Sequence, residues 1–161
     1  MLVVAALVPA GCGGEEPQPR SHAELVAKID ARCEVTNAET KKINEEAELV
    51  GERADTQEQL LRELAPILER ASDQVRQNAA AFKSVEPTGN DAAKLDRIRR
   101  FYDRQTRLAH KFAAAAKRGA VDEFKMLSEL QKDLLRRLRK ATSDFGFKEC
   151  GSTRSDATRA V

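Results

Sequence analysis

Residues 21–50 read SHAELVAKIDARCEVTNAETKKINEEAELV, and their pattern indicates the class of fold. Its apolar and small residues recur in alternating steps of three and four, at Val26, Ile29, Cys33, Thr36, Thr40, Ile43, Ala47 and Val50. That spacing places all eight side chains on one stripe of an α-helix. The stretch therefore predicts a long amphipathic helix, which Gly51 is expected to end.

Three more segments repeat the pattern, from about residue 55 to 85, from 91 to 117 and from 122 to 144. Thr56 and Gln59 have the spacing of a helix-capping box at the start of the first of them. Pro66 lies inside the same segment, and we expect it to kink or split that helix. The inward stripes are Leu61, Leu64, Leu68, Ala71, Val75, Asn78, Phe82 and Val85; Leu95, Ile98, Tyr102, Gln105, Ala109, Phe112 and Ala116; and Phe124, Leu127, Gln131, Leu134, Leu138, Ala141 and Phe145.

Short connections separate these four segments. Residues 87–90, Pro-Thr-Gly-Asn, form a turn cluster, and Gly119 suits the left-handed position that closes a helix. Short connections make neighbouring helices antiparallel. The sequence therefore predicts an all-α fold, an up-down-up-down four-helix bundle with long helices over residues 21–150. One long continuous coiled coil is the alternative, which the regularly spaced Gly and Pro turns disfavour.

The composition agrees with long helices and bounds the partners. The chain has 161 residues, of which 34% are charged and only 4% aromatic, and it contains no Trp. Abundant charged residues with few aromatics are typical of amphipathic helices rather than sheets. The formal net charge is only +2, so the chain has no overall bias toward nucleic acid, and we expect no nucleic-acid partner.

The N-terminus has the pattern of an export signal. Residues 2–8 are all apolar, which is too short a run to cross a bilayer but long enough for the core of a signal peptide. The small residues Ala10 and Gly11 then precede Cys12. This end resembles the lipobox of bacterial lipoproteins. The resemblance implies that residues 1–11 are a signal peptide and that Cys12 carries lipid, which would hold the protein to the extracytoplasmic face of a cell membrane.

Two other readings of the N-terminus stay open. Val8 and Ala10 also fit an ordinary signal-peptidase site, which would release a soluble secreted protein. Alternatively, the apolar start is fortuitous and the protein is cytoplasmic. Residues 12–20 are rich in Gly and Pro and predict a flexible tether, and the polar residues 151–161 predict a disordered tail.

The other two cysteines lie near the start and near the end, in sequence, of the segment that is predicted to form the bundle. In an up-down-up-down bundle the start of the first helix and the end of the last lie at the same end. Cys150 could then reach Cys33 if Phe145-Gly146-Phe147 folds back over the end of the core. We therefore predict a Cys33–Cys150 disulfide, provided that the protein is exported to an oxidising compartment. The alternative is that Cys33 is a buried thiol and Cys150 a residue of the tail.

No motif in the chain predicts catalysis, a metal site or a cofactor. Di-iron bundles use Glu-x-x-His pairs, but the residues three before His22 and His110 are Pro19 and Arg107. There is no Cys-x-x-Cys-His, nucleophile elbow or phosphate loop. We expect His22 to be solvated and His110 to lie at the boundary or surface of the bundle. The sequence thus predicts a protein that is not an enzyme.

A basic stripe is the first candidate for binding. Residues spaced by three and four along the third helix are all cationic, at Arg97, Arg100, Arg104, Arg107 and Lys111. They predict contact with an anionic partner such as lipid headgroups, cell-wall polymer or an acidic protein face. The alternative is a solvated face whose charges pair with acidic neighbours. A second basic group, Arg136, Arg137, Arg139 and Lys140, either faces the membrane or complements the dipole at the end of the fourth helix.

Polar residues on the inward stripes are the second candidate. Thr36, Thr40, Asn78 and Gln105 all fall at inward positions. Such groups either fix the register of the helices or line a pocket for a small ligand. The sequence therefore favours a non-enzymatic, lipid-anchored, extracytoplasmic helical bundle acting as an interaction or structural module of the cell envelope. An extracytoplasmic bundle that binds a small ligand is the alternative, and a cytoplasmic helical adaptor is a more remote one. The helical segments resemble no specific family.

Overall fold

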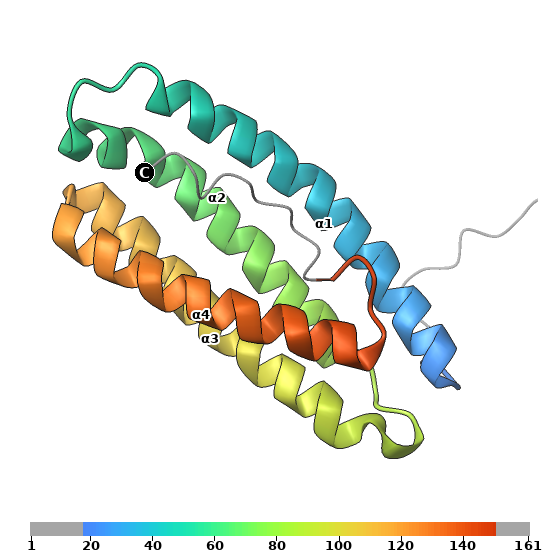
Figure 1. Ribbon diagram of the computed structural model, residues 1–161. Coiled ribbons are helices and arrows are strands. Elements are labelled where there is room, and N and C mark those ends of the chain that lie inside the picture. The colour runs from blue at the N-terminus through green and yellow to red at the C-terminus, as the bar shows by residue number, and fades with distance from the viewer. Residues whose placement is uncertain (1–17, 151–161) are drawn as a thin grey trace, which may run out of the picture.

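The computed structural model describes residues 18–150, and the predicted all-α fold is confirmed there. Four long helices, with no strand among the described residues, occupy α1 His22–Gly51, α2 Gln57–Ser84, α3 Ala92–Arg118 and α4 Val121–Phe145. A short 3-10 helix, η1 Gly89–Asp91, precedes α3. Figure 1 shows the four helices side by side, with each helix packed against the next one along the chain.

The ends of the helices follow the local sequence. Ser21 and Thr56 cap α1 and α2, because their hydroxyls accept hydrogen bonds from the backbone N–H groups three residues later. Gly119 adopts the left-handed conformation predicted for it, with φ +66°. Pro66 does not split α2, which runs unbroken from Gln57 to Ser84. An exposed proline is tolerated here because tertiary packing holds the flanking turns in place.

The largest core cluster lies at the end of the bundle where α1 begins and α4 ends. Phe82 of α2 is fully buried in it, with its ring 4.6 Å from that of Tyr102. The inward stripe of α1 begins at Leu25, which is fully buried, rather than at the predicted Val26, which is only partly buried. The buried faces of α2 and α3 are wider than their predicted stripes. They also include Ala65, Ile67, Ser72, Ala79, Phe101, Ala113 and Ala115.

At the other end of the bundle the apolar contacts divide. Ile43 and Val50 of α1 form a cluster with Ile67 and its partly buried neighbours on α2, while separate clusters join α2, α3 and α4. Among the helices, α1 packs extensively only on α2. The connection of α1 to the rest of the fold therefore depends on α2 and on the residues that follow α4.

Those residues, 146–150, fold back over the end of the core as the sequence predicts. Gly146 has φ +110°, and the N–H of Phe147 donates to the carbonyl of Thr142, which closes α4 in a Schellman arrangement. The Phe147 ring stacks on Phe145 at 4.7 Å and meets Phe82 edge-on at 5.4 Å. A glycine is needed at position 146 because a side chain is strained at this φ.

Several contacts with α1 hold this closing segment, among them a hydrogen bond of 3.0 Å from the side-chain amide of Asn37 to the carbonyl of Glu149. The Sγ atoms of Cys33 and Cys150 are 2.06 Å apart in a disulfide, with their Cα atoms 5.2 Å apart. The carboxylate of Asp30 accepts hydrogen bonds from three consecutive backbone N–H groups, those of Lys148, Glu149 and Cys150, at 2.9, 3.0 and 3.3 Å. The side chain of Asp30 thus gives the segment the partners that a regular element would supply.

We predict that Asp30→Ala loosens the closing segment. Because hydrogen bonds to a charged group contribute about 1.5–3 kcal/mol each at most and these three share one carboxylate, we expect a loss of about 1–3 kcal/mol in the free energy of unfolding. The Cys33–Cys150 disulfide should also be reduced faster by dithiothreitol. Urea unfolding and timed reduction with alkylation measure the two effects.

Asp73→Ala is the matched control, because Asp73 is an exposed helical aspartate whose ion pair is with Arg76. Such a surface substitution should change stability by no more than about 0.5 kcal/mol. If the two variants match in stability and in reduction rate, Asp30 does not hold the segment.

Candidate binding surface on α3 and α4

The structure keeps the predicted basic stripe together on one exposed face of α3. All five of its residues are exposed: Arg97, Arg100, Arg104, Arg107 and Lys111. Three of them, Arg104, Arg107 and Lys111, line a groove of about 490 Å³ between α3 and α4. The stripe therefore borders a concave surface, which the sequence pattern alone did not indicate.

The charges of the stripe are not neutralised by carboxylates. Among residues 18–150, no ion pair joins a carboxylate to Arg100, Arg104, Arg107 or Lys111. The guanidinium of Arg97 lies over the ring of Phe101, at 5.7 Å from the centroid. The acidic neighbours are already engaged: Asp96 pairs with Arg99, and Asp103 pairs with Lys83 of α2.

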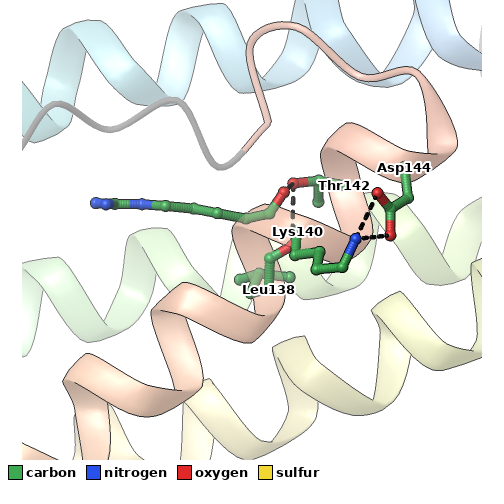
Figure 2. A network of polar contacts seen from close by, with 5 residues as sticks. Leu138, Lys140, Thr142 and Asp144 are labelled. Carbon is green, nitrogen blue, oxygen red and sulfur yellow. Dashed lines mark hydrogen bonds and ion pairs between the residues drawn. The ribbon is translucent and has the colours of Figure 1, made fainter.

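The basic group at the end of α4 contrasts with this stripe. Figure 2 shows the ammonium group of Lys140 between both carboxylate oxygens of Asp144, at 3.0 and 2.9 Å. Arg136 and Arg137 both pair with Asp133. In the same view, the buried hydroxyl of Thr142 bonds back to the carbonyl of Leu138 at 3.0 Å. Three of the four cations in this group therefore pair with carboxylates of their own helix, two of them sharing Asp133.

The groove has one cationic wall, on α3, and one wall, on α4, in which two leucines lie beside an ion pair. The α3 side carries Arg104, Arg107 and Lys111, with the partly buried Leu108 behind them. The α4 side carries Leu130, Leu134 and the Asp133–Arg137 pair. Leu130 is 56% exposed, and Met126, one turn earlier on α4, is 58% exposed.

Leu130 and Met126 did not enter the sequence analysis, because they lie off the inward stripe of α4. Their spacing is the sequence feature that could have identified them. Two large apolar residues four positions apart on the polar face of an amphipathic helix form a local apolar patch.

The predicted polar residues of the core do come together. The hydroxyl of Thr36 bonds to the side-chain oxygen of Asn78 at 2.9 Å, and Thr40 bonds back to the carbonyl of Thr36. Asn78 and Gln105 line a cavity of about 50 Å³, together with Tyr102. Burial raises the pKa of Tyr102, so its phenol stays protonated. The buried Oε1 atom of Gln105 has no hydrogen-bond partner among the described residues.

The two histidines are engaged in local contacts. His22 is exposed, as expected, with about half of its side chain accessible; its Nδ1 lies 2.7 Å from a carboxylate oxygen of Asp91, and its ring packs on Phe145. Burial raises the pKa of Asp91, but hydrogen bonds from His22 and Thr88 outweigh it, so this pKa lies below its ordinary value. His110 is exposed, as expected, and lies 3.3 Å from the buried hydroxyl of Ser72.

The remaining predicted features divide between the described and the undescribed residues. The structure brings Cys33 and Cys150 together. Cys12, the signal peptide and the predicted tail lie outside residues 18–150, as does most of the tether. Within residues 18–150, no three His, Cys, Asp or Glu side chains are grouped as a metal site would need, and no helix is long and apolar enough to span a membrane.

Comparison with known proteins identifies no relative: no protein-family model, curated protein or solved structure matches this chain.

We predict that Gln105→Leu stabilises the protein. The substitution removes a buried oxygen that lacks a partner, and such a group costs about 1–3 kcal/mol. The free energy of unfolding in urea should therefore rise, by about 1 kcal/mol once imperfect packing is allowed for. Asn78→Leu is the contrasting variant and should lower stability, because Asn78 accepts the hydrogen bond from Thr36. A Gln105→Leu variant as unstable as Asn78→Leu would show that the Gln105 amide makes a necessary bond.

Proposed function

We propose that this chain is a non-enzymatic binding module, held by lipid on Cys12 to the extracytoplasmic face of a cell membrane. Its helices form an up-down-up-down bundle, and its basic stripe engages an anionic component of the envelope. The observation that carries the proposal is the stripe itself: four consecutive stripe cations, from Arg100 to Lys111, lie on an exposed face without carboxylate partners among residues 18–150.

The short connections support the proposed topology. Two residues, Gly119 and Ala120, join α3 to α4, and five residues join α1 to α2. Connections this short favour antiparallel neighbours. The course of the chain in Figure 1 and the contact between Cys150 and Cys33 also favour this arrangement.

The cysteines support export. Disulfides persist in oxidising compartments and are rare in the cytosol. Pairing of Cys33 with Cys150 leaves Cys12 as the one remaining cysteine of the three in the chain. An odd cysteine in an exported protein needs a separate role, and lipid attachment supplies one.

Gln18 bears on the geometry of the anchor. Its side chain donates to the carbonyl of Ser84 and accepts from the N–H of Glu86, which ties residue 18 to the end of α2. Cys12 and Gln18 are six positions apart, so the chain between them spans at most about 22 Å when fully extended. A lipid on Cys12 would therefore keep this end of the bundle close to the membrane.

The core cavity gives little support to the alternative of a small ligand inside the bundle. Its volume of about 50 Å³ suits one or two water molecules, whereas ligand pockets measure about 300–1,000 Å³. The polar core residues are better assigned to fixing the register of the helices. We propose no catalytic role for His110, because its neighbour Ser72 is buried and no carboxylate among the described residues bonds to the ring.

Cys12→Ser tests the anchor. Expressed in a bacterial host, the unsubstituted protein should fractionate with membranes and have an intact mass that begins at Cys12 and includes lipid. The Cys12→Ser variant should lack the lipid mass. Alkylation without reductant should label neither Cys33 nor Cys150. If the protein instead begins at Met1, carries no lipid and takes up label at both Cys33 and Cys150, the proposed export is wrong and the protein is cytoplasmic.

Removing charge from the stripe tests the binding surface. We expect the triple variant Arg100→Gln, Arg104→Gln and Arg107→Gln to bind anionic vesicles and poly-L-glutamate about a hundredfold more weakly at low salt, because each cation near an anionic surface contributes about 1 kcal/mol. Cosedimentation and fluorescence titration measure the two affinities.

The control removes the same charge elsewhere, through Lys41→Gln, Lys42→Gln and Arg76→Gln. These three cations already pair with carboxylates of their own helices, so their loss should change affinity little. Equal effects of the two triple variants would mean that net charge, rather than the stripe, attracts the partner.

A further inference from the structure

We infer that the groove between α3 and α4 binds an anionic amphiphile, a molecule in which a carboxylate or phosphate head is joined to a single apolar chain. This inference rests on the proposed function, because it names the class of partner that the basic stripe would hold. The groove is lined by Arg104, Arg107, Leu108, Lys111, Leu130, Asp133, Leu134 and Arg137.

The cationic wall selects the head of such a ligand. Arg104, Arg107 and Lys111 face the groove without carboxylate partners among residues 18–150, while Arg137 across the groove is already paired with Asp133. The excess positive charge therefore lies on the α3 side. Guanidinium groups suit carboxylate and phosphate oxygens, because they donate two parallel hydrogen bonds.

The leucines on the α4 side of the groove suit the apolar chain of such a ligand. Leu134 forms part of the buried core, and Leu130 extends from it into solvent, with 56% of its surface exposed. Met126 continues this apolar surface by one more turn of α4. Covering exposed aliphatic surface is favourable, and an apolar patch beside charged residues is a common mark of a binding site.

The size of the groove suits a small molecule. Its volume of about 490 Å³ falls within the range of about 300–1,000 Å³ found for ligand sites. Arg104 and Lys111 are two helical turns apart, about 10 Å along α3, and Leu130 and Arg137 span the same length of α4. A flat membrane surface would contact only the edges of this groove, whereas an acyl chain can lie within it.

Simpler ligands match only one of the two walls. An inorganic anion or an acidic polymer would pair with Arg104 and Arg107 but leave Leu130 exposed. A neutral apolar molecule would cover Leu130 but take charged groups out of water without giving them a partner, which is unfavourable. Only a ligand with both parts satisfies both walls.

In the test, the purified full-length protein is titrated with lysophosphatidylglycerol below the critical micelle concentration of the lipid, and calorimetry measures the binding. Glycerol phosphate, which carries a phosphate without the chain, and monooleoylglycerol, which has the chain without the charge, are the comparison ligands. We expect the amphiphile to bind at least tenfold more tightly than either.

Two variants with matched controls locate the site. Leu130→Ser should weaken the amphiphile about tenfold and leave poly-L-glutamate binding unchanged, whereas the Arg104→Gln, Arg107→Gln pair should weaken both. Leu49→Ser on α1 is the control for Leu130, because Leu49 is also 56% exposed. Lys41→Gln with Lys42→Gln is the control for the arginines. Neither control should change the affinity for the amphiphile.

The outcomes separate this inference from the proposed function. Equal binding of the amphiphile and glycerol phosphate, or equal effects of Leu130→Ser and Leu49→Ser, would overturn the amphiphile site. If the arginines were then still needed for anionic vesicles or poly-L-glutamate, the proposed function would stand without it. If no anionic probe depended on the arginines, both would be wrong.

Discussion

The attachment of residues 146–150 to α1 joins the two ends of the helical chain and keeps the start of α1 on the core. Because α1 packs extensively only on α2, its first turns meet the core mainly through Leu25, Ile29 and Cys33. The Cys33–Cys150 disulfide and the Asp30 carboxylate fix the closing segment there, and Phe147 is thereby held against Phe82. A bridge between residues 117 apart in sequence removes much of the freedom of the unfolded chain, about 4–5 kcal/mol in the chain-entropy account.

The uncompensated charge on α3 follows from where its acidic residues fall. Arg104 and Lys111 have no acidic residue three or four positions away. Asp103 is close in sequence to Arg100 and Arg107, but it is engaged by Lys83 of α2. On α4, in contrast, Asp133 and Asp144 lie at the spacing that lets helical ion pairs form. The basic residues of the two helices therefore present different surfaces.

Periodicity predicted much of this architecture, because helix positions repeat on a fixed pitch. It located the four helices to within a few residues, and it placed Ile29, Tyr102 and Leu138 in the core. It did not locate Asp30 or Gln18, whose partners are backbone groups 118 and 66 residues away. Such contacts depend on how the helix ends lie relative to one another in the folded protein, and no local sequence pattern predicts that arrangement. The groove escaped prediction for the same reason, since its walls come from two helices.

The net charge of +2 conceals a segregation of charge that bears on recognition. Acidic residues outnumber basic ones seven to four over residues 21–50, whereas basic residues outnumber acidic ones nine to three over residues 91–118. Since α1 has little contact with α3, these opposite charges do not neutralise each other by pairing. Screening at physiological salt acts over about 8 Å, so a partner near α3 responds to the stripe rather than to the whole molecule. A nearly neutral protein can in this way present a strongly cationic face, and this is the face that we propose engages an anionic partner.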